Sequence, residues 1–273
     1  MEPTLKIPLG QRPDLVDMAG PAYDLVSPKP AQKTLLICSA PRTGSYELCR
    51  FLIAAGIGIP HEYFHPQFAT DIARRFGLSG NPLAGENISP YIDALRSHRS
   101  QNGVLAINMQ YWQFSGHLMN APGAALFKKA LVVHLFRPDI VNQVTSWRVA
   151  MNTGIWDFSP RRTSEPRQYP PELEKRVEQY QNDLKFVAGE DMGFRELFAL
   201  AGIRPYFITM EDFFRAPQQT IEHIAKELGV SVNTEAMNAA IAVGKPYARN
   251  EVAYQLATIG LDDPLRRKAF LLE

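Results

Sequence analysis

Two short loops in this sequence carry the residues best suited to bind a phosphate or sulfate group. The first reads Ser39-Ala40-Pro41-Arg42-Thr43-Gly44-Ser45 and precedes a predicted helix. Its backbone amides would open the helix N-terminus, where anions bind favourably, and Gly44 lets the chain turn closely around an anion. Arg42, Thr43 and Ser45 add side-chain donors. The alternative is an ordinary strand-to-helix turn with Ser45 as the helix N-cap.

The second loop lies in the sequence HLFRPD. Arg137 comes directly after a predicted strand, Asp139 starts the next helix, and Ser146 follows about two turns along it. An arginine and a helix hydroxyl that converge here would hold a second phosphate. The alternative is that Arg137 is a surface residue near a helix N-terminus and that the Ser146 hydroxyl makes a hydrogen bond to its own helix backbone. Together the two loops favour a ligand with two separated phosphate-like groups.

The sequence lacks the Walker A pattern of ordinary ATP-binding proteins. GxxxxGK[ST] is absent, and the Gly-Lys pair at Gly244-Lys245 is followed by proline. These observations disfavour ordinary P-loop ATP chemistry.

Alternating strands and helices must hold both loops in place. Continuous apolar runs predict strands over residues 34–38, 104–109, 130–136 and 205–210. Helical periodicity predicts helices over 46–55, 139–152, 172–201 and 217–228, with a polar loop over 159–171. This alternation indicates a single α/β domain whose parallel sheet is flanked by helices on both faces. In such sheets the ligand site lies at the carboxyl ends of the strands, where both loops fall.

The two ends of the chain differ from this pattern. Residues 1–32 contain many prolines and show no sustained period, so they predict an extended arm lying against the body. Residues 33–273 would then form the domain, with the last 45 or so packing back across it.

Composition excludes several classes of protein. Of the 273 residues, 45% are apolar and 21% are charged, as in an ordinary globular protein. A net charge of +1 provides no global field for nucleic acid or an anionic membrane. The apolar stretch 51–60 is far shorter than the roughly 20 residues that cross a bilayer, and the N-terminus does not resemble a secretory signal. We therefore expect a cytoplasmic protein without a transmembrane segment.

The two cysteines do not suggest a disulfide or a zinc site. Cys38 falls in an apolar strand pattern and Cys49 in an amphipathic helix pattern, where buried free thiols are common.

Several separated motifs, in the same order, resemble a known family. The segments LLICSAPRTGSYELCRFLIAAGIGIPHEYF and LVVHLFRPDIVNQVTSWRVAMNTGIW are similar to bacterial sulfotransferases related to trehalose 2-sulfotransferase, which include lipopolysaccharide and glycan sulfotransferases. The resemblance spans about residues 33–158 and implies a P-loop-like α/β fold that uses 3′-phosphoadenosine 5′-phosphosulfate (PAPS). It implies that Arg42, Thr43, Gly44 and Ser45 bind the 5′-phosphosulfate. Arg137 and Ser146 would bind the 3′-phosphate.

The same resemblance implies a general base. Pro60-His61-Glu62-Tyr63-Phe64 matches the family's Pro-x-Glu-[Phe/Tyr]-Phe segment, whose glutamate is the proposed base. An alcohol must lose its proton as it attacks sulfur, so Glu62 is the candidate base and Arg42 the candidate stabiliser of the leaving group. His61 and His65 are rival bases, and a solvated loop carboxylate is the alternative for Glu62. This chemistry requires no metal.

One departure from the family lies in the strand GVLAINMQYW, where Asn108 stands at the usual position of a lysine. An asparagine donates hydrogen bonds but cannot neutralise developing charge. Either Arg42 suffices, another basic residue substitutes, or activity is altered. Arg249 matches an arginine of the family's C-terminal segment and is a candidate phosphate contact.

Aromatic residues are candidates for the acceptor side of the site. Trp112, Trp147 and Trp156 can form walls that stack on pyranose rings. Trp156 lies in the sequence NTGIW, which matches a family motif, whereas core packing is an equal alternative for Trp147.

The sequence therefore predicts a PAPS-dependent sulfotransferase that modifies a hydroxyl of a saccharide or glycolipid. A nucleotide or small-molecule kinase is the second hypothesis, disfavoured by the missing Walker lysine. A catalytically weakened descendant that binds the product PAP is the third, and it is motivated by Asn108. Dimers occur in the family, so a homodimer is among the assemblies that the resemblance implies.

Overall fold

The computed structural model describes residues 13, 15–154, 156 and 173–244. Five strands of this part of the chain form one sheet in the order β2-β3-β1-β4-β5. Their bounds are β1 (Lys33–Ser39), β2 (Ser100–Gln101), β3 (Val104–Met109), β4 (Ala130–Phe136) and β5 (Tyr206–Thr209). β1 pairs in parallel with β3 and β4, and β4 with β5, so the predicted parallel α/β sheet is confirmed. The short edge strand β2, which is antiparallel to β3, was not predicted.

Side chains alternate between the two faces of the sheet because successive residues of a strand point in opposite directions. On β1, Leu36 and Cys38 join one hydrophobic cluster, while Leu35 and Ile37 join the other. All four are fully buried, which explains why the strands read as unbroken apolar runs.

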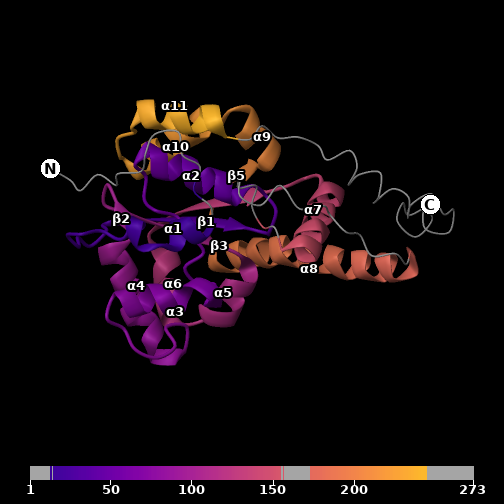
Figure 1. Cartoon of the computed structure of the whole chain (residues 1–273), viewed down its shortest axis with the longest axis horizontal. Helices are drawn as coiled ribbons and strands as arrows, with labels where there is room; N and C mark the ends of the chain where they lie inside the picture. The colour runs from indigo at the N-terminus through magenta and orange to yellow at the C-terminus, as the bar shows by residue number, and fades with distance from the viewer. Residues whose placement is uncertain (1–12, 14, 155, 157–172, 245–273) are drawn as a thin grey trace.

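Helices cover both faces, as the sequence predicts (Figure 1). One layer consists of α2 (Ser45–Ala55), α9 (Met210–Arg215), α10 (Pro217–Leu228) and α11 (Thr234–Val243). The other consists of α3 (Pro66–Arg75), α4 (Ile88–His98), α5 (Tyr111–His117), α6 (Ala121–Lys128) and α8 (Leu173–Ala201). Both layers pack on the same central strands, so the described core is one unit.

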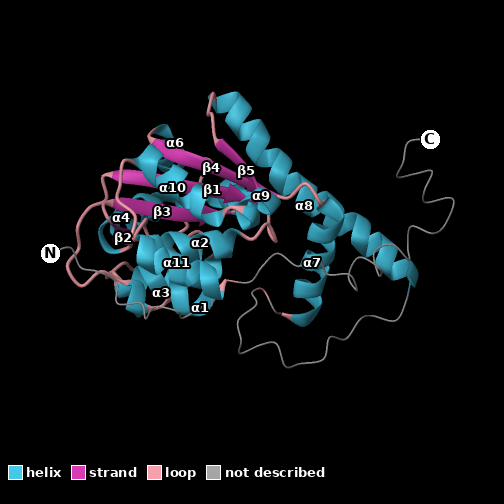
Figure 2. Ribbon diagram, turned by 90° about the horizontal axis from the view of Figure 1, so that it is seen from above, coloured by secondary structure: helices cyan, strands magenta, loops and turns pink. Residues whose placement is uncertain are grey.

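Two helices extend the molecule beyond the sheet. α7 (Ile140–Thr153) follows β4, and α8 continues past the sheet to lie beside α7 (Figure 2). The indole Nε1 of Trp147 donates to Asp183 Oδ1 at 3.2 Å and joins the two helices. α8 is also attached to the sheet, because Nε2 of the buried His134 on β4 lies 2.8 Å from Asp191 Oδ1.

The segment 61–64 lies beside β3 because the chain that leaves α2 runs along this strand. After α2, His61 pairs in parallel with Ile107, and the amide of Asn108 donates to the His61 carbonyl at 3.0 Å. Gly58 permits this close approach: its φ is +71°, and a Cβ there would lie only 2.6 Å from the Cβ of Ala106. Glu62 consequently follows directly on the strand-like pairing at the carboxyl end of β3.

The described part of the predicted N-terminal arm is not uniformly extended. It contains α1 (Leu15–Ala19) and a 3-10 turn at Pro21–Tyr23, because Met18 and Tyr23 bury their side chains in the core beside α2. Beyond the turn, the Leu25 amide donates to the His98 carbonyl at 2.9 Å, so the segment lies against the end of α4.

Part of the predicted C-terminal packing is visible, since α11 lies on α2. The predicted loop 159–171 and Arg249 fall outside the described residues.

Neither cysteine is paired with another: Cys38 and Cys49 are buried free thiols. Burial raises the pKa of each thiol above its usual value, which keeps both neutral. Within the described residues, no helix combines the length and the apolar character needed to cross a membrane.

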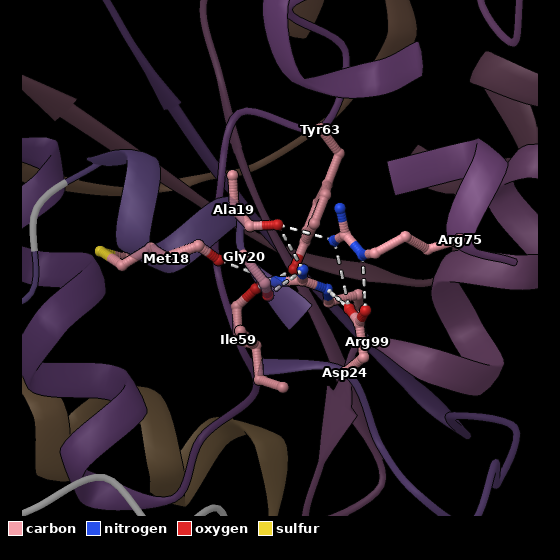
Figure 3. Close-up of polar contacts among 8 residues, drawn as sticks. All are labelled: Met18, Ala19, Gly20, Asp24, Ile59, Tyr63, Arg75 and Arg99. Atoms are coloured by element: carbon pink, nitrogen blue, oxygen red, sulfur yellow. Dashed lines mark hydrogen bonds and ion pairs between the residues drawn. The ribbon is translucent and has the colours of Figure 1, made fainter. Parts of the chain in front are cut away.

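A buried arginine joins the N-terminal segment to the body (Figure 3). Arg99 is fully buried and donates to the carbonyls of Met18, Ala19 and Gly20 at 2.7–2.8 Å. Its Nε lies 2.7 Å from Asp24 Oδ1, and its guanidinium lies 5.9 Å from the centre of the Tyr63 ring. The cluster therefore supports the residue next to Glu62.

Arg99→Met should lower the free energy of unfolding by about 2–4 kcal/mol, because the carbonyls of Met18 and Gly20 lose this donor, whereas Arg75 still contacts Asp24 and the Ala19 carbonyl, each at 2.7 Å. Urea unfolding followed by circular dichroism measures the change. Arg74→Met is the matched control: Arg74 pairs with Asp71 at the surface, where a pair contributes about 1 kcal/mol or less. Equal unfolding midpoints for the two variants would contradict a structural role for Arg99.

Candidate active site

The carboxyl ends of β1, β3 and β4 meet at one edge of the sheet because these strands are parallel neighbours. The loop after β1 leads into α2, the residues after β3 lead into α5, and Arg137 follows β4. The sequence predictions from separate segments thus converge on this edge.

The loop between β1 and α2 has a strained backbone. Arg42 has a φ of 67°, in the left-handed region that non-glycine residues rarely adopt. The buried Thr43 hydroxyl donates to the Ala40 carbonyl at 3.1 Å and closes the turn. The helix N-cap is Gly44, with φ 79°, so the alternative that Ser45 is the N-cap is wrong. Ser45 is instead the first residue of α2.

Arg42 joins the first predicted anion-binding loop to α7, the helix that follows the second loop. Its Nε donates to the Ser146 hydroxyl on α7 at 3.0 Å, and its Nη1 donates to the Trp156 carbonyl. Gln143, one turn before Ser146, donates from Nε2 to the Pro41 carbonyl at 2.8 Å. α7 and the first loop are therefore joined at two points.

Arg137, the other predicted phosphate ligand, lies beside a carboxylate. Its Nε is 3.9 Å from Oε1 of Glu211, the second residue of α9. The side chain of Arg137 is largely buried at the end of β4.

Asn108 lies at the first loop. Its side chain is fully buried, and Nδ2 donates to the Ser45 hydroxyl at 3.3 Å. Oδ1 is buried without a hydrogen-bond partner among the described residues. Asn108, at the position where the resemblance leads one to expect a lysine, thus contacts the predicted phosphosulfate loop directly.

The Glu62 carboxylate is buried and held by two glutamines. Gln113 Nε2 donates to Glu62 Oε2 at 2.6 Å, and Gln110 Nε2 donates to Glu62 Oε1 at 3.1 Å. Only 5% of the residue is exposed, so the alternative of a solvated loop carboxylate is wrong.

Other hydrogen bonds fix the orientation of both glutamine amides. Gln110 Oε1 accepts from the indole Nε1 of Trp112 at 2.8 Å, and Gln113 Oε1 accepts from the backbone N–H of Gln110 at 3.4 Å. With their oxygens engaged elsewhere, both amides present N–H donors to Glu62.

Burial raises the pKa of Glu62 from its usual value of 4.5 to about 7. The donors from Gln113, Tyr46 and Gln110 act in the opposite direction, because they stabilise the charged form. A carboxylate with a pKa near 7 can accept a proton at neutral pH and return it to solvent.

The rival bases have other structural roles. His65 is the N-cap of α3, where Nδ1 accepts from the Gln67 amide at 3.2 Å, and partial burial lowers its pKa. His61 is fully buried, and its ring packs edge-on to Phe68 with 4.7 Å between ring centres. Glu62 remains the candidate base: its carboxylate is buried at the sheet edge, and its pKa lies near 7.

The three tryptophans do not form one wall. The rings of Trp147 and Trp156 contact each other, with centres 5.3 Å apart, and Phe186 of α8 packs on Trp147 at 4.8 Å. Trp112 instead lies against His65 at 5.2 Å and donates to Gln110. Trp156 is 39% exposed.

Comparison with known proteins gives the chain a family. A model of the Stf0 sulphotransferase family matches residues 34–250. The chain belongs to this sulfotransferase family. Among solved structures, it is similar to a sulfotransferase domain from the curacin biosynthetic pathway, with 14% identity, a TM-score of 0.43, and coverage of 86% of this chain and 98% of the other. No curated protein sequence matched.

Sequence reasoning missed the polar residues that support the predicted ones. These are Gln110, Gln113, Gln143, Glu190 and Glu211. The glutamines of the Gln110-x-x-Gln113 spacing form a capping box, a pattern visible in the sequence. The other three contacts join segments that are distant in sequence, so no local pattern reveals them.

Glu62→Gln should stabilise the protein increasingly as pH rises from about 5 to 7, because the unfolded chain ionises Glu62 near pH 4.5 while the folded state resists ionisation until about 7. Below pH 4.5 both states are protonated and carry no such penalty. Above 7 the gain is constant, at up to roughly 3 kcal/mol. Thermal unfolding across this range measures it.

Glu196→Gln, at an exposed position on α8, controls for the loss of one negative charge. A stability gain for Glu62→Gln that does not change between pH 5 and 8 would mean that Glu62 is not buried as described.

Proposed function

We propose that this protein transfers the sulfuryl group of PAPS to a hydroxyl of a saccharide or glycolipid. Membership of a sulfotransferase family supports the reaction class. The observation that carries the proposal is the buried Glu62 carboxylate, whose pKa of about 7 suits a base, at the sheet edge that carries the anion-directed loops.

The side chains at the first loop suit a polyanion. Arg42, Ser45 and Asn108 supply donors, and the N-terminus of α2 adds backbone amides. In the proposed complex, Arg42, Thr43, Gly44 and Ser45 hold the 5′-phosphosulfate, while Arg137 and Ser146 hold the 3′-phosphate. Because Arg42 already bonds to Ser146, it can join the two ends of one nucleotide site.

Glu62 accepts the proton of the acceptor hydroxyl as that oxygen forms its bond to sulfur. The bond between sulfur and the bridging oxygen of the 5′-phosphate breaks at the same time, and the electron pair leaves on the phosphate. Arg42 and the amides of the loop stabilise this developing charge. Asn108 contributes a neutral donor near Ser45, so the arginine supplies the cationic charge in this mechanism.

Aromatic residues support the acceptor class. Trp147 and Trp156 form a contiguous aromatic pair next to Arg42, whose Nη1 donates to the Trp156 carbonyl. An accessible aromatic face stacks on the apolar face of a pyranose ring.

Labelled PAPS incubated with the protein and with separate glycan, glycolipid and simple-alcohol fractions tests the proposal, with product masses as the readout. Transfer to a sugar hydroxyl is expected. Tight PAP binding without transfer to any fraction would favour the catalytically weakened binding protein. Binding of ATP with Mg²⁺ but not of PAP would favour the kinase, which the family match already disfavours.

Arg42→Ala and Arg137→Ala should each weaken PAP binding by roughly 1.5–3 kcal/mol, the usual contribution of a charge-assisted hydrogen bond. Isothermal calorimetry measures both. Arg74→Ala removes an exposed arginine from α3 and serves as the charge control. Wild-type affinity in both loop variants would refute the nucleotide site. A loss in Arg137→Ala alone would support the 3′-phosphate contact of Arg137 and refute the 5′-phosphosulfate contact of Arg42.

Glu62→Gln should reduce turnover by about 10²- to 10⁴-fold, because an amide keeps the shape of the side chain but cannot accept the proton. The affinity for PAP should be nearly unchanged, which separates the chemical step from binding. Steady-state rates and PAP calorimetry on one preparation check both expectations. If most of the turnover survives, the base is His61, His65 or water.

A further inference from the structure

A second buried carboxylate lies close to Glu62 and is not used by the proposed mechanism. Glu190 of α8 is 4% exposed, and its Oε1 accepts from the backbone amide of Trp112 in the first turn of α5 at 2.9 Å. Oε2 is buried and has no hydrogen-bond partner among the described residues. A buried carboxylate is costly unless it is hydrogen-bonded, and the bond from the Trp112 amide offsets part of this cost.

The position of Glu190 is fixed by the packing of α8. Gly193, nearly one turn later, lies directly against Tyr111, and a Cβ there would be only 2.3 Å from the tyrosine ring. Asp191, the next residue, lies 2.8 Å from the buried His134 of the central sheet. The carboxylate of Glu190 is therefore presented to α5 from a helix that is anchored on both sides.

A continuous set of hydrogen bonds leads from Glu190 to the candidate base. Glu190 accepts a hydrogen bond from the backbone amide of Trp112, and the indole of Trp112 donates to Gln110 Oε1 at 2.8 Å. Gln110 and Gln113, at the start of the same helix, donate to the two oxygens of Glu62. We propose that Glu190 is a positioning residue, which fixes the first turn of α5 and thereby directs both glutamines at Glu62.

This role rests on the proposed function only in that Glu62 acts as a base. Loss of the hydrogen bond between Glu190 and the Trp112 amide should change the environment of Glu62, and this change can be measured without any turnover. The appropriate observable is the proton affinity of Glu62, because the glutamine donors stabilise its charged form.

The other titratable groups around Glu62 must be considered before its titration is interpreted. On α2, burial keeps Tyr46 and Cys49 neutral, and Arg50 pairs with Glu47 at 2.8 Å. His61 and His65 flank Glu62 in its own segment.

From α8, Glu190 itself faces Glu62. Burial raises the pKa of Glu190 to about 7, backbone amides of α5 lower it, and the charge of Glu62 raises it. Any variant of Glu190 therefore removes a charge as well as a contact, and the experiment must separate these effects.

Glu190→Gln and Glu190→Ala make this separation. Both remove the charge, but only glutamine keeps an oxygen that accepts from the Trp112 amide. Carbon-13 NMR of glutamate-labelled protein measures the pKa of Glu62, with Glu62→Gln identifying the resonance. The Glu62 pKa should be about 0.5–1 unit higher in Glu190→Ala than in Glu190→Gln, the shift that corresponds to a weakened hydrogen bond.

Glu190→Ala and Glu190→Gln should also differ in catalytic rate. We expect kcat to be roughly 10-fold lower in Glu190→Ala than in Glu190→Gln, with the affinity for PAP unchanged, because misplacement of a catalytic group slows chemistry without affecting distant binding. Glu196→Ala, at an exposed position on the same helix, should match the wild type in both measurements. Equal Glu62 pKa values in the alanine and glutamine variants would overturn the proposal.

If Glu190→Ala does not fold, Glu190→Asp replaces it, since aspartate keeps the charge and is shorter by one methylene. It is compared with the wild type, and an unchanged Glu62 pKa would again overturn the proposal. A shifted Glu62 pKa in a protein that transfers no sulfuryl group would support the positioning role and refute the proposed function. The two ideas therefore fail in distinguishable ways.

Discussion

The carboxylate of Glu62 is removed from water, and an ionised carboxylate in that position is costly unless donors surround it. Two glutamines from α5 supply those donors, at 2.6 and 3.1 Å. The balance between burial and hydrogen bonding keeps the pKa of Glu62 near 7 rather than at its usual 4.5. Much of the surrounding structure positions either Glu62 or the two glutamines that donate to it.

That support comes from all sides of the carboxylate. The pairing of His61 with Ile107 places the segment at the end of β3, and Gly58 allows the chain to approach that strand. Behind the segment, the Tyr63 ring packs near the buried guanidinium of Arg99. On the other side, α8 holds the start of α5 through Glu190. These contacts hold the Glu62 side chain in place although it lies on a loop.

The parts of this arrangement that the sequence predicts are those with a local signal. Continuous apolar runs predicted β1, β3 and β4, and Arg42 and Arg137 were found because each directly follows such a strand. Gln110 and Gln113 were missed although they have the spacing of a capping box, because glutamine is not among the usual N-cap residues. The contact between Glu190 and Trp112 had no local signal, since it joins residues 78 positions apart. The short helix α1 was missed because core burial of Met18 overrides a proline-rich composition.

In the proposed mechanism, the buried Glu62, whose pKa lies near 7, removes the proton from the acceptor hydroxyl. The most direct test is the pH dependence of a single turnover in the wild-type protein with saturating PAPS, which isolates chemistry from product release. The rate should rise through an acid limb with a midpoint of about 7 and then level off, following the ionisation of Glu62. A rate that is already constant above pH 5 would contradict the account, because it would mean that the group accepting the proton is not the buried carboxylate.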